Sequence, residues 1–220
     1  MTGRGDGQDS PEQGHATARH IERVASGLFA DRGFAATPVR AIAEAAGVTC
    51  PTLYYHFKSK EGLAQELLTR PSSEVVAALR RLLSDAALDP LGRVVRMVDA
   101  MLDFSRAAPE RARFLYAVMF GPADECLAAE AEAFVREINA LLDEATGRLE
   151  GAGILAPGRA PDLTKALRGL VVIHTMDFLY RDGTLPPDLA DRIVRDQLLG
   201  LAGPEARPGP SGRPPDALPG

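Results

Sequence analysis

The sequence predicts an all-α protein of about nine helices, because apolar residues recur with the helical period in nearly every segment after residue 16. No stretch shows the alternation of apolar and polar residues that a β-strand requires, and aromatic residues make up only 5% of the chain. A length of 220 residues is enough for one sizeable domain, or for a small and a medium one that share an interface.

The first predicted helix opens an N-terminal unit. Its apolar side chains form a single stripe at helical spacing: Ile21, Val24, Ala25, Leu28 and Phe29. Gly33 follows the stripe and supplies the left-handed residue that ends many helices. Thr37 is expected to cap a second helix, with Pro38 at its first position, where a missing N–H has no cost.

A third, short helix is predicted to follow almost at once. Gly47 ends the second helix, and Thr49 can cap the third because its hydroxyl can accept a hydrogen bond from the backbone N–H of Thr52. Val48 and Leu53 can pack across the start of this helix as a hydrophobic staple. A helix, a glycine turn and a short capped helix together have the spacing of a helix-turn-helix.

The chain is predicted to contain an N-terminal unit over residues 15–62 and a helical body over residues 63–202. Ser59 is expected to cap the first helix of the body, and Pro71 is expected to kink or break that helix. The two ends are polar or rich in Pro and Gly, and we expect both to be disordered: residues 1–14 and residues 203–220.

The composition argues against several classes of protein. No apolar run is long enough to cross a bilayer, and the first residues lack the apolar core of a signal peptide, so a cytoplasmic protein is expected. Cys50 and Cys126 lack the spacing of a metal site and are too few for a disulfide framework. The sequence contains no nucleophile elbow and no phosphate-binding glycine loop, so we expect neither an enzyme nor a cofactor.

The charge is distributed unevenly along the chain. The net charge is −5, yet residues 15–62 carry six basic and four acidic side chains, and the excess of acid lies after Gly62. A slightly basic unit joined to an acidic body can still dock on nucleic acid if its positive groups lie on the docking face.

The predicted third helix has an unusual exposed face. Successive residues are about 100° apart on a helix, so Phe57 lies beside the buried Leu53, while Pro51 and Tyr55 point the opposite way. Tyr54 lies on the flank of this face. Two tyrosines could be ordinary core aromatics, but their angular position favours contact with phosphates and base edges.

Residues 37–63, TPVRAIAEAAGVTCPTLYYHFKSKEGL, resemble the signature of the tetracycline-repressor-like (TetR) family of regulators. The resemblance implies a homodimer, a palindromic DNA operator and a ligand pocket in the body. It further implies that five residues grip the DNA backbone: Thr37, Thr52, Tyr54, His56 and Lys60. Four others are implied to approach the bases: Thr49, Cys50, Pro51 and Tyr55. Cys50 could also be a redox sensor, but a lone thiol is more often structural.

A ligand pocket is predicted where Met and Phe are concentrated in the body, because such side chains suit adaptable apolar sites. The candidate residues are Met97, Met101, Phe104, Leu115, Met119, Phe120, Phe134, His174, Asp177 and Phe178. His174 and Asp177 interrupt an apolar segment, where burial would require partners. They form either a structural pair or a polar handle for a ligand, and a metal site is the less favoured alternative.

A dimer interface is predicted on the last two long helices, packed as a four-helix bundle with those of a second copy. The candidate residues are the apolar stripes of these helices: Leu163, Leu167, Leu170, Val171, Leu189, Ile193, Val194, Leu198 and Leu201.

The sequence therefore predicts a transcription regulator whose partners are double-stranded DNA, a second copy of the chain and a small effector, with no membrane partner. The favoured mechanism is a repressor released from its operator by a small, mostly apolar ligand. One alternative is a regulator with a solid core that responds to a protein partner or to concentration alone. Another is an enzyme fused to a DNA-binding unit.

Overall fold

The computed structural model describes residues 11–121 and 125–200, and within these ranges the chain is all-helical, as the sequence predicted. The helices are α1 (Pro11–Arg32), α2 (Val39–Ala45), α3 (Cys50–Phe57), α4 (Lys60–Ser84), α5 (Pro90–Ala107), α6 (Pro109–Phe120), α7 (Glu125–Gly151), α8 (Ala160–Tyr180) and α9 (Leu189–Leu199). Within the same ranges no helix is both long and apolar enough to cross a membrane.

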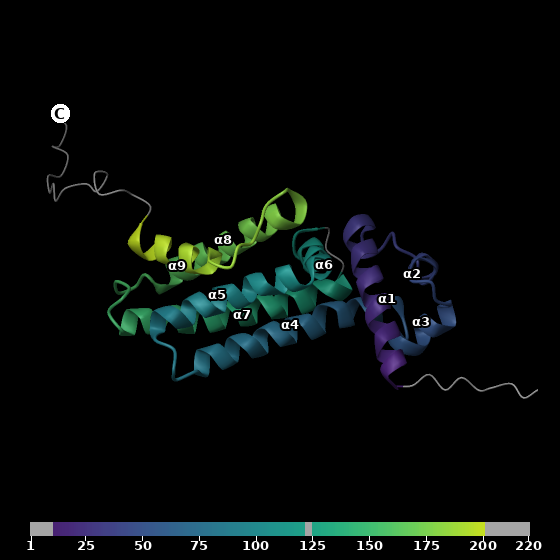
Figure 1. The fold of residues 1–220 in the computed structure, drawn as a ribbon, viewed down its shortest axis with the longest axis horizontal. Helices are drawn as coiled ribbons and strands as arrows, with labels where there is room; N and C mark the ends of the chain where they lie inside the picture. The colour runs from purple at the N-terminus through teal and green to yellow at the C-terminus, as the bar shows by residue number, and fades with distance from the viewer. Residues whose placement is uncertain (1–10, 122–124, 201–220) are drawn as a thin grey trace, which may run out of the picture.

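The helices form a small cluster joined to a long body (Figure 1). Helices α1, α2 and α3 lie together at one end, and α4, α5 and α7 run the length of the body. Helices α8 and α9 cover α5 and α7 on one side, and α6 lies between the body and α1. Helix α6 therefore occupies the junction between the two parts.

Two hydrophobic cores stabilise this arrangement. One is formed by the body, from Val75 to Val194. The other centres on α1–α3, but it also includes the first turns of α4 and two side chains of α6, Phe114 and Leu115. The rings of Phe29 and Phe114 pack with their centroids 5.2 Å apart. The expected boundary at residue 62 therefore falls inside a continuous core.

Two of the three predicted caps are present. The Thr49 hydroxyl accepts a hydrogen bond from the Thr52 N–H at 3.3 Å, and the Ser59 hydroxyl accepts one from the Gly62 N–H at 2.9 Å. The prediction for Thr37 is wrong, because Pro38 occupies the cap position of α2. The Thr37 hydroxyl instead donates to the Gly33 carbonyl oxygen at 2.8 Å, which fixes the turn between α1 and α2.

Pro71 lies inside an unbroken helix, so of the two predicted outcomes, a kink or a break of α4, the break is wrong. A proline removes one backbone hydrogen bond, but its neighbours Leu68 and Val75 are buried in the two cores on either side of it. The Ser73 hydroxyl also donates to the Arg70 carbonyl oxygen at 2.8 Å. Tertiary packing thus keeps the helix continuous.

Helix α1 starts earlier than expected, so residues 11–14 are helical although they were assigned to the disordered tail. Pro11 at the start and Glu12 in the first turn both favour a helix N-terminus. The remainder of that tail and residues 203–220 lie outside the described residues.

Candidate functional site

The start of α3 presents the exposed face that the helical spacing predicts. Leu53 and Phe57 are buried, whereas Tyr55 is 83% exposed and Tyr54 is 46% exposed. Thr49 and Pro51 are also exposed at the first turn. An apolar ring that stays in water at this position is available to a macromolecular partner.

The hydroxyls of Thr49 and Thr52 lie 2.9 Å apart at the same helix end. This pair borders the first turn of α3, where backbone N–H groups and the helix dipole favour an anion. Cys50 is half-buried and packs against the α1–α3 core, so it is less available than its neighbours.

Three further candidates for DNA contact have structural partners. Thr37 is fully buried, so its side chain does not reach the surface. Lys60 donates from Nζ to the Phe34 carbonyl oxygen at 3.0 Å, and Nζ also lies 4.2 Å from the centroid of the Phe34 ring. His56 is half-buried, with its ring centroid 5.2 Å from that of Tyr55. The exposed candidates are therefore concentrated at the start of α3. Thr37, His56 and Lys60 instead contact neighbouring parts of the protein and help to hold α3 in place.

An ionic cluster joins α1 to the body, and sequence reasoning missed it. Glu22 of α1 is 1% exposed and is paired with Arg70 of α4. Its Oε2 atom also lies 3.2 Å from Nη2 of Arg111 of α6. The sequence does place a carboxylate, Glu22, beside the apolar stripe of the first helix. Its partners could not be recognised, because they lie far away in the sequence.

The body contains a cavity of about 80 Å³ among α4, α5, α6, α7 and α8. Five of the ten predicted ligand-pocket residues line it: Met101, Phe104, Leu115, Met119 and Phe134. The sequence did not single out the polar side chains that line it, which are Tyr116, Asn139 and Arg168. Burial raises the pKa of the Tyr116 hydroxyl above its ordinary value.

The other five predicted pocket residues do not line this cavity. Met97 is fully buried in the body core, and Phe178 packs against the same core. Phe120 is 63% exposed on the outside of α6. Asp177 is paired with Arg181 at 3.0 Å, and neither it nor His174 lines the cavity. On α8, His174 and Asp177 lie about 240° and 180° around the helix from Arg168, which faces the cavity.

The predicted dimer residues are not a free surface. Six are buried within the chain: Leu163, Leu167, Val171, Leu189, Ile193 and Val194. Leu170 and Leu198 pack against the same core, and Leu201 lies outside the described residues. The stripe in each helix is therefore its inward face, which covers the body core. The exposed apolar side chains of α8 are instead Ile173, which is 48% exposed, and Tyr180.

Comparison with known proteins agrees with the geometry of α1–α4. Residues 21–67 match the family model described as bacterial regulatory proteins, tetR family. The transcriptional repressor KstR2 of Mycolicibacterium smegmatis is 35% identical over 95 residues, which cover 43% of this chain and 46% of that protein. The chain thus spans less than half the length of this curated relative.

Solved structures share the whole fold. PfmR, a TetR-family transcriptional regulator from Thermus thermophilus, superposes with a TM-score of 0.69 at 22% identity, over 83% of this chain and 99% of its own. AibR, solved in complex with isovaleryl coenzyme A and operator DNA, gives a TM-score of 0.64 at 22% identity, over 81% of this chain and 96% of its own. KstR2 and PfmR are both described as transcription regulators, which is the class of protein that the sequence predicts. The chain therefore carries a domain of the TetR family of bacterial regulatory proteins over residues 21–67, and its fold is that of solved TetR-family regulators.

Proposed function

We propose that this chain is a homodimeric transcription repressor that binds a palindromic operator through α3 and is released by a small, mostly apolar ligand. The observation that carries the proposal is the exposed start of α3, with Thr49, Pro51 and Tyr55 facing outward, within the segment that matches the family. A protein of this function acts in the cytoplasm, as the sequence predicts.

The chemistry of this face fits duplex DNA. The hydroxyls of Thr49, Thr52 and Tyr54 can donate to phosphate oxygens, which fixes the position of the helix. Tyr55, the most exposed aromatic side chain among the described residues, can reach base edges or thymine methyl groups in the major groove. Phosphate contact and base contact are thereby assigned to different side chains.

A palindromic operator requires two copies of α3 related by a two-fold axis. The outer face of α8 supports such a dimer, because Ala166, Gly169, Ile173 and Met176 recur on it at helical spacing. Ile173 is exposed and the others are half-buried or exposed, so this face has apolar area left to cover. The interface is therefore proposed on the outer face of α8 and not on the buried stripes.

Helix α6 connects the cavity to the DNA-binding unit. Leu115, Tyr116 and Met119 line the cavity, while Arg111 and Phe114 contact Glu22 and Phe29 of α1. A ligand that shifts α6 therefore changes the support of α1. The complex of AibR with isovaleryl coenzyme A and operator DNA supports a small effector for a protein of this fold. The cavity favours this mechanism over the effector-free alternative, which requires a solid core.

Selection from a pool of genomic fragments tests the proposal. We expect enrichment of one inverted repeat, with binding that weakens steeply as salt rises, because phosphate contacts release counterions. A matched control is the same protein with Tyr55→Ala, which should retain binding but enrich the repeat poorly. Binding without enrichment of any inverted repeat by the unaltered protein would contradict the proposed function.

A further inference from the structure

We propose that the effector is an anionic amphiphile, a short acyl chain that carries a carboxylate or phosphate group at one end. This inference rests on the proposed ligand-responsive function and names the chemical class of its ligand. It is built from the cavity in the body, from an outer cleft that adjoins it, and from the side chains at their junction.

The inner part of the site suits a short apolar chain. Most of the side chains that line it are apolar, among them Met101, Phe104, Phe134 and Ile138. Its volume of about 80 Å³ is roughly half that of a cavity of about 150 Å³ that binds benzene. Methionine and aromatic side chains adapt to irregular shapes, which favours a linear or branched chain of few carbons.

The inner cavity adjoins a wider cleft of about 620 Å³ between α6, α7 and α8. The two share the residues at their junction: Met119, Val135, Asn139, Arg168 and Val172. A molecule whose tail occupies the cavity therefore has its other end in the cleft. Phe120 at the edge of the cleft stacks on Tyr116, with ring centroids 6.0 Å apart, and extends the apolar wall.

The charges of the cleft favour an anion. Arg136 and Arg168 line it, and among the described residues that line it Glu132 is the single carboxylate. Neither arginine forms an ion pair or hydrogen bond with another residue in the described part of the chain, whereas Arg80 and Arg148 of the same body are paired with glutamates. Two guanidinium groups beside an apolar cavity can bind the head group of an amphiphile, because guanidinium matches carboxylate and phosphate oxygens.

Asn139 provides a polar group at the junction. Its Oδ1 atom is buried and has no hydrogen-bond partner. Rotation of the amide by half a turn would present Nδ2–H instead, so this side chain can bond to a hydroxyl or a carbonyl of the ligand. A carbonyl at the start of the acyl chain would lie between the apolar tail and the arginines, where Asn139 is found.

The test compares three four-carbon probes by calorimetry on the purified full chain: butyrate, butyryl coenzyme A and 1-butanol. Both anionic probes share the tail, but one supplies a carboxylate and the other phosphates. We expect at least one of them to bind ten-fold or more tightly than the alcohol. Equal affinity for the alcohol, or no binding of any probe, would overturn the proposal.

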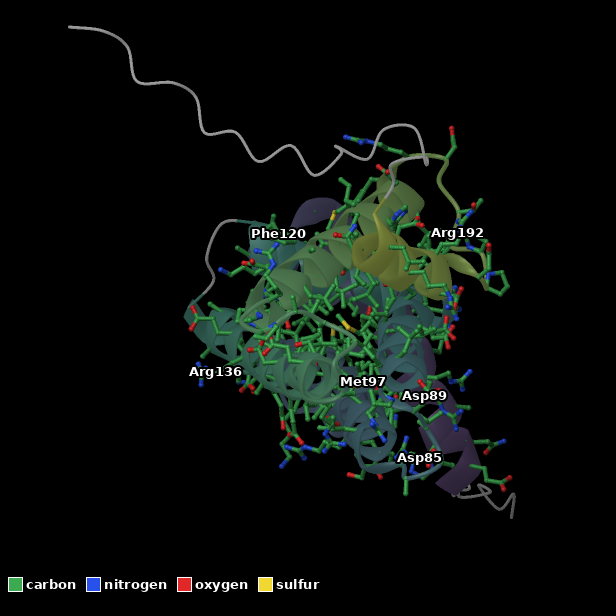
Figure 2. The ribbon with its side chains drawn as sticks, turned by 90° about the vertical axis from the view of Figure 1, so that its left-hand side faces the viewer. Asp85, Asp89, Met97, Phe120, Arg136 and Arg192 are labelled. Carbon is green, nitrogen blue, oxygen red and sulfur yellow. The ribbon has the colours of Figure 1, made fainter. Side chains whose placement is uncertain are left out.

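Variants locate the head group. Arg168→Gln and Arg136→Gln should each weaken binding of the anionic probe about ten-fold and leave binding of the alcohol unchanged. Arg168→Lys should retain most of the affinity for the anionic probe. Arg192→Gln is the matched control, because Arg192 lies on α9, on the opposite side of the molecule from Phe120 and Arg136 (Figure 2). An equal loss in Arg192→Gln, or no loss in either cleft variant, would contradict the assignment.

The two proposals fail separately. Ligand binding is measured without DNA, and operator selection is measured without ligand. If the protein enriches an inverted repeat but binds the alcohol as well as the anions, the ligand class is wrong and the DNA-binding function stands. If the anionic probe binds through the cleft arginines but no repeat is enriched, the proposed function is wrong.

Discussion

The α1–α3 unit and the body use polar side chains in opposite ways. In the unit, the polar side chains proposed to contact DNA lie within a few residues of one another at the exposed start of α3. In the body, buried and half-buried guanidinium groups bind backbone carbonyls of other segments of the chain. Arg106 donates to the carbonyl oxygens of Leu185 and Pro186, at 2.8 and 3.1 Å, and so anchors the segment between α8 and α9 onto α5.

Arg93 shows the same use at the end of α4. It is almost fully buried and donates to the carbonyl oxygens of Leu82, Asp85 and Leu88. The last carbonyls of a helix lack partners within it, and here a side chain from the next helix supplies them. In the α1–α3 unit, neighbouring residues on one helix therefore form the exposed face. In the body, the structure depends on contacts between different segments of the chain.

The largest expected effect separates the two faces of the last helices. Val194 is fully buried, so Val194→Glu places a charge in the body core and should lower the free energy of unfolding by about 4 kcal/mol or more. Ile173→Glu lies on the outer face of α8 and should cost less than about 1 kcal/mol of unfolding free energy within a subunit, while it should dissociate the proposed dimer. Urea unfolding and sedimentation measure the two effects. A folded, monomeric Val194→Glu protein would instead show that the dimer interface lies on the apolar stripes of α8 and α9, as the sequence predicted.

The next effect concerns Arg93. Arg93→Met removes all three hydrogen bonds to the last turn of α4 and to the loop that follows it and should lower the free energy of unfolding by about 3 kcal/mol. Arg80→Met is the control, because its ion pair with Glu137 is exposed and should contribute at most about 1 kcal/mol. Similar losses in both variants by denaturant titration would show that buried and exposed arginines do not differ here.

These arginines also mark the limit of prediction from sequence. The all-α class, the caps Thr49 and Ser59 and the exposed tyrosines could be predicted, because spacing along one helix decides them. The cap at Thr37, and the break that was one of the two outcomes expected at Pro71, were predicted wrongly, because a neighbouring carbonyl and tertiary packing override the local preference. The apolar stripe around Val194 was recognised correctly, but periodicity alone cannot tell whether a stripe faces its own core or a second copy.

A smaller effect is expected on DNA recognition. Tyr55→Ala should reduce discrimination between operator variants by about 1–3 kcal/mol, because the side chain proposed to reach the bases is removed. The folded unit should keep its stability, since Tyr55 is 83% exposed. Tyr55→Phe serves as the control that keeps the ring. Competition binding with single-base operator variants measures the difference. Unchanged discrimination in Tyr55→Ala would show that Tyr55 does not contact the bases.

The smallest effect lies in the turn between α3 and α4. Lys58 has a φ of 61°, a conformation that L-residues rarely adopt. Lys58→Gly should therefore stabilise the fold by about 1 kcal/mol, after allowing for the greater freedom of glycine when unfolded. Thermal unfolding measures this gain, with Lys58→Ala as the control that removes the charge but keeps the strain. A loss of stability with glycine would show that the strain is relieved elsewhere.

The position of α6 has a consequence for how the regulator responds in the presence of its operator. Because the same helix lines the cavity and contacts α1, the proposed ligand and DNA would bias one structural equilibrium from its two ends. Thermodynamic linkage then makes the effect reciprocal. The operator must lower the affinity of the protein for the ligand by the same factor by which the ligand lowers its affinity for the operator. Promoter-bound protein would respond at a higher effector concentration than free protein, and the ratio of the two concentrations would equal the coupling factor that α6 transmits.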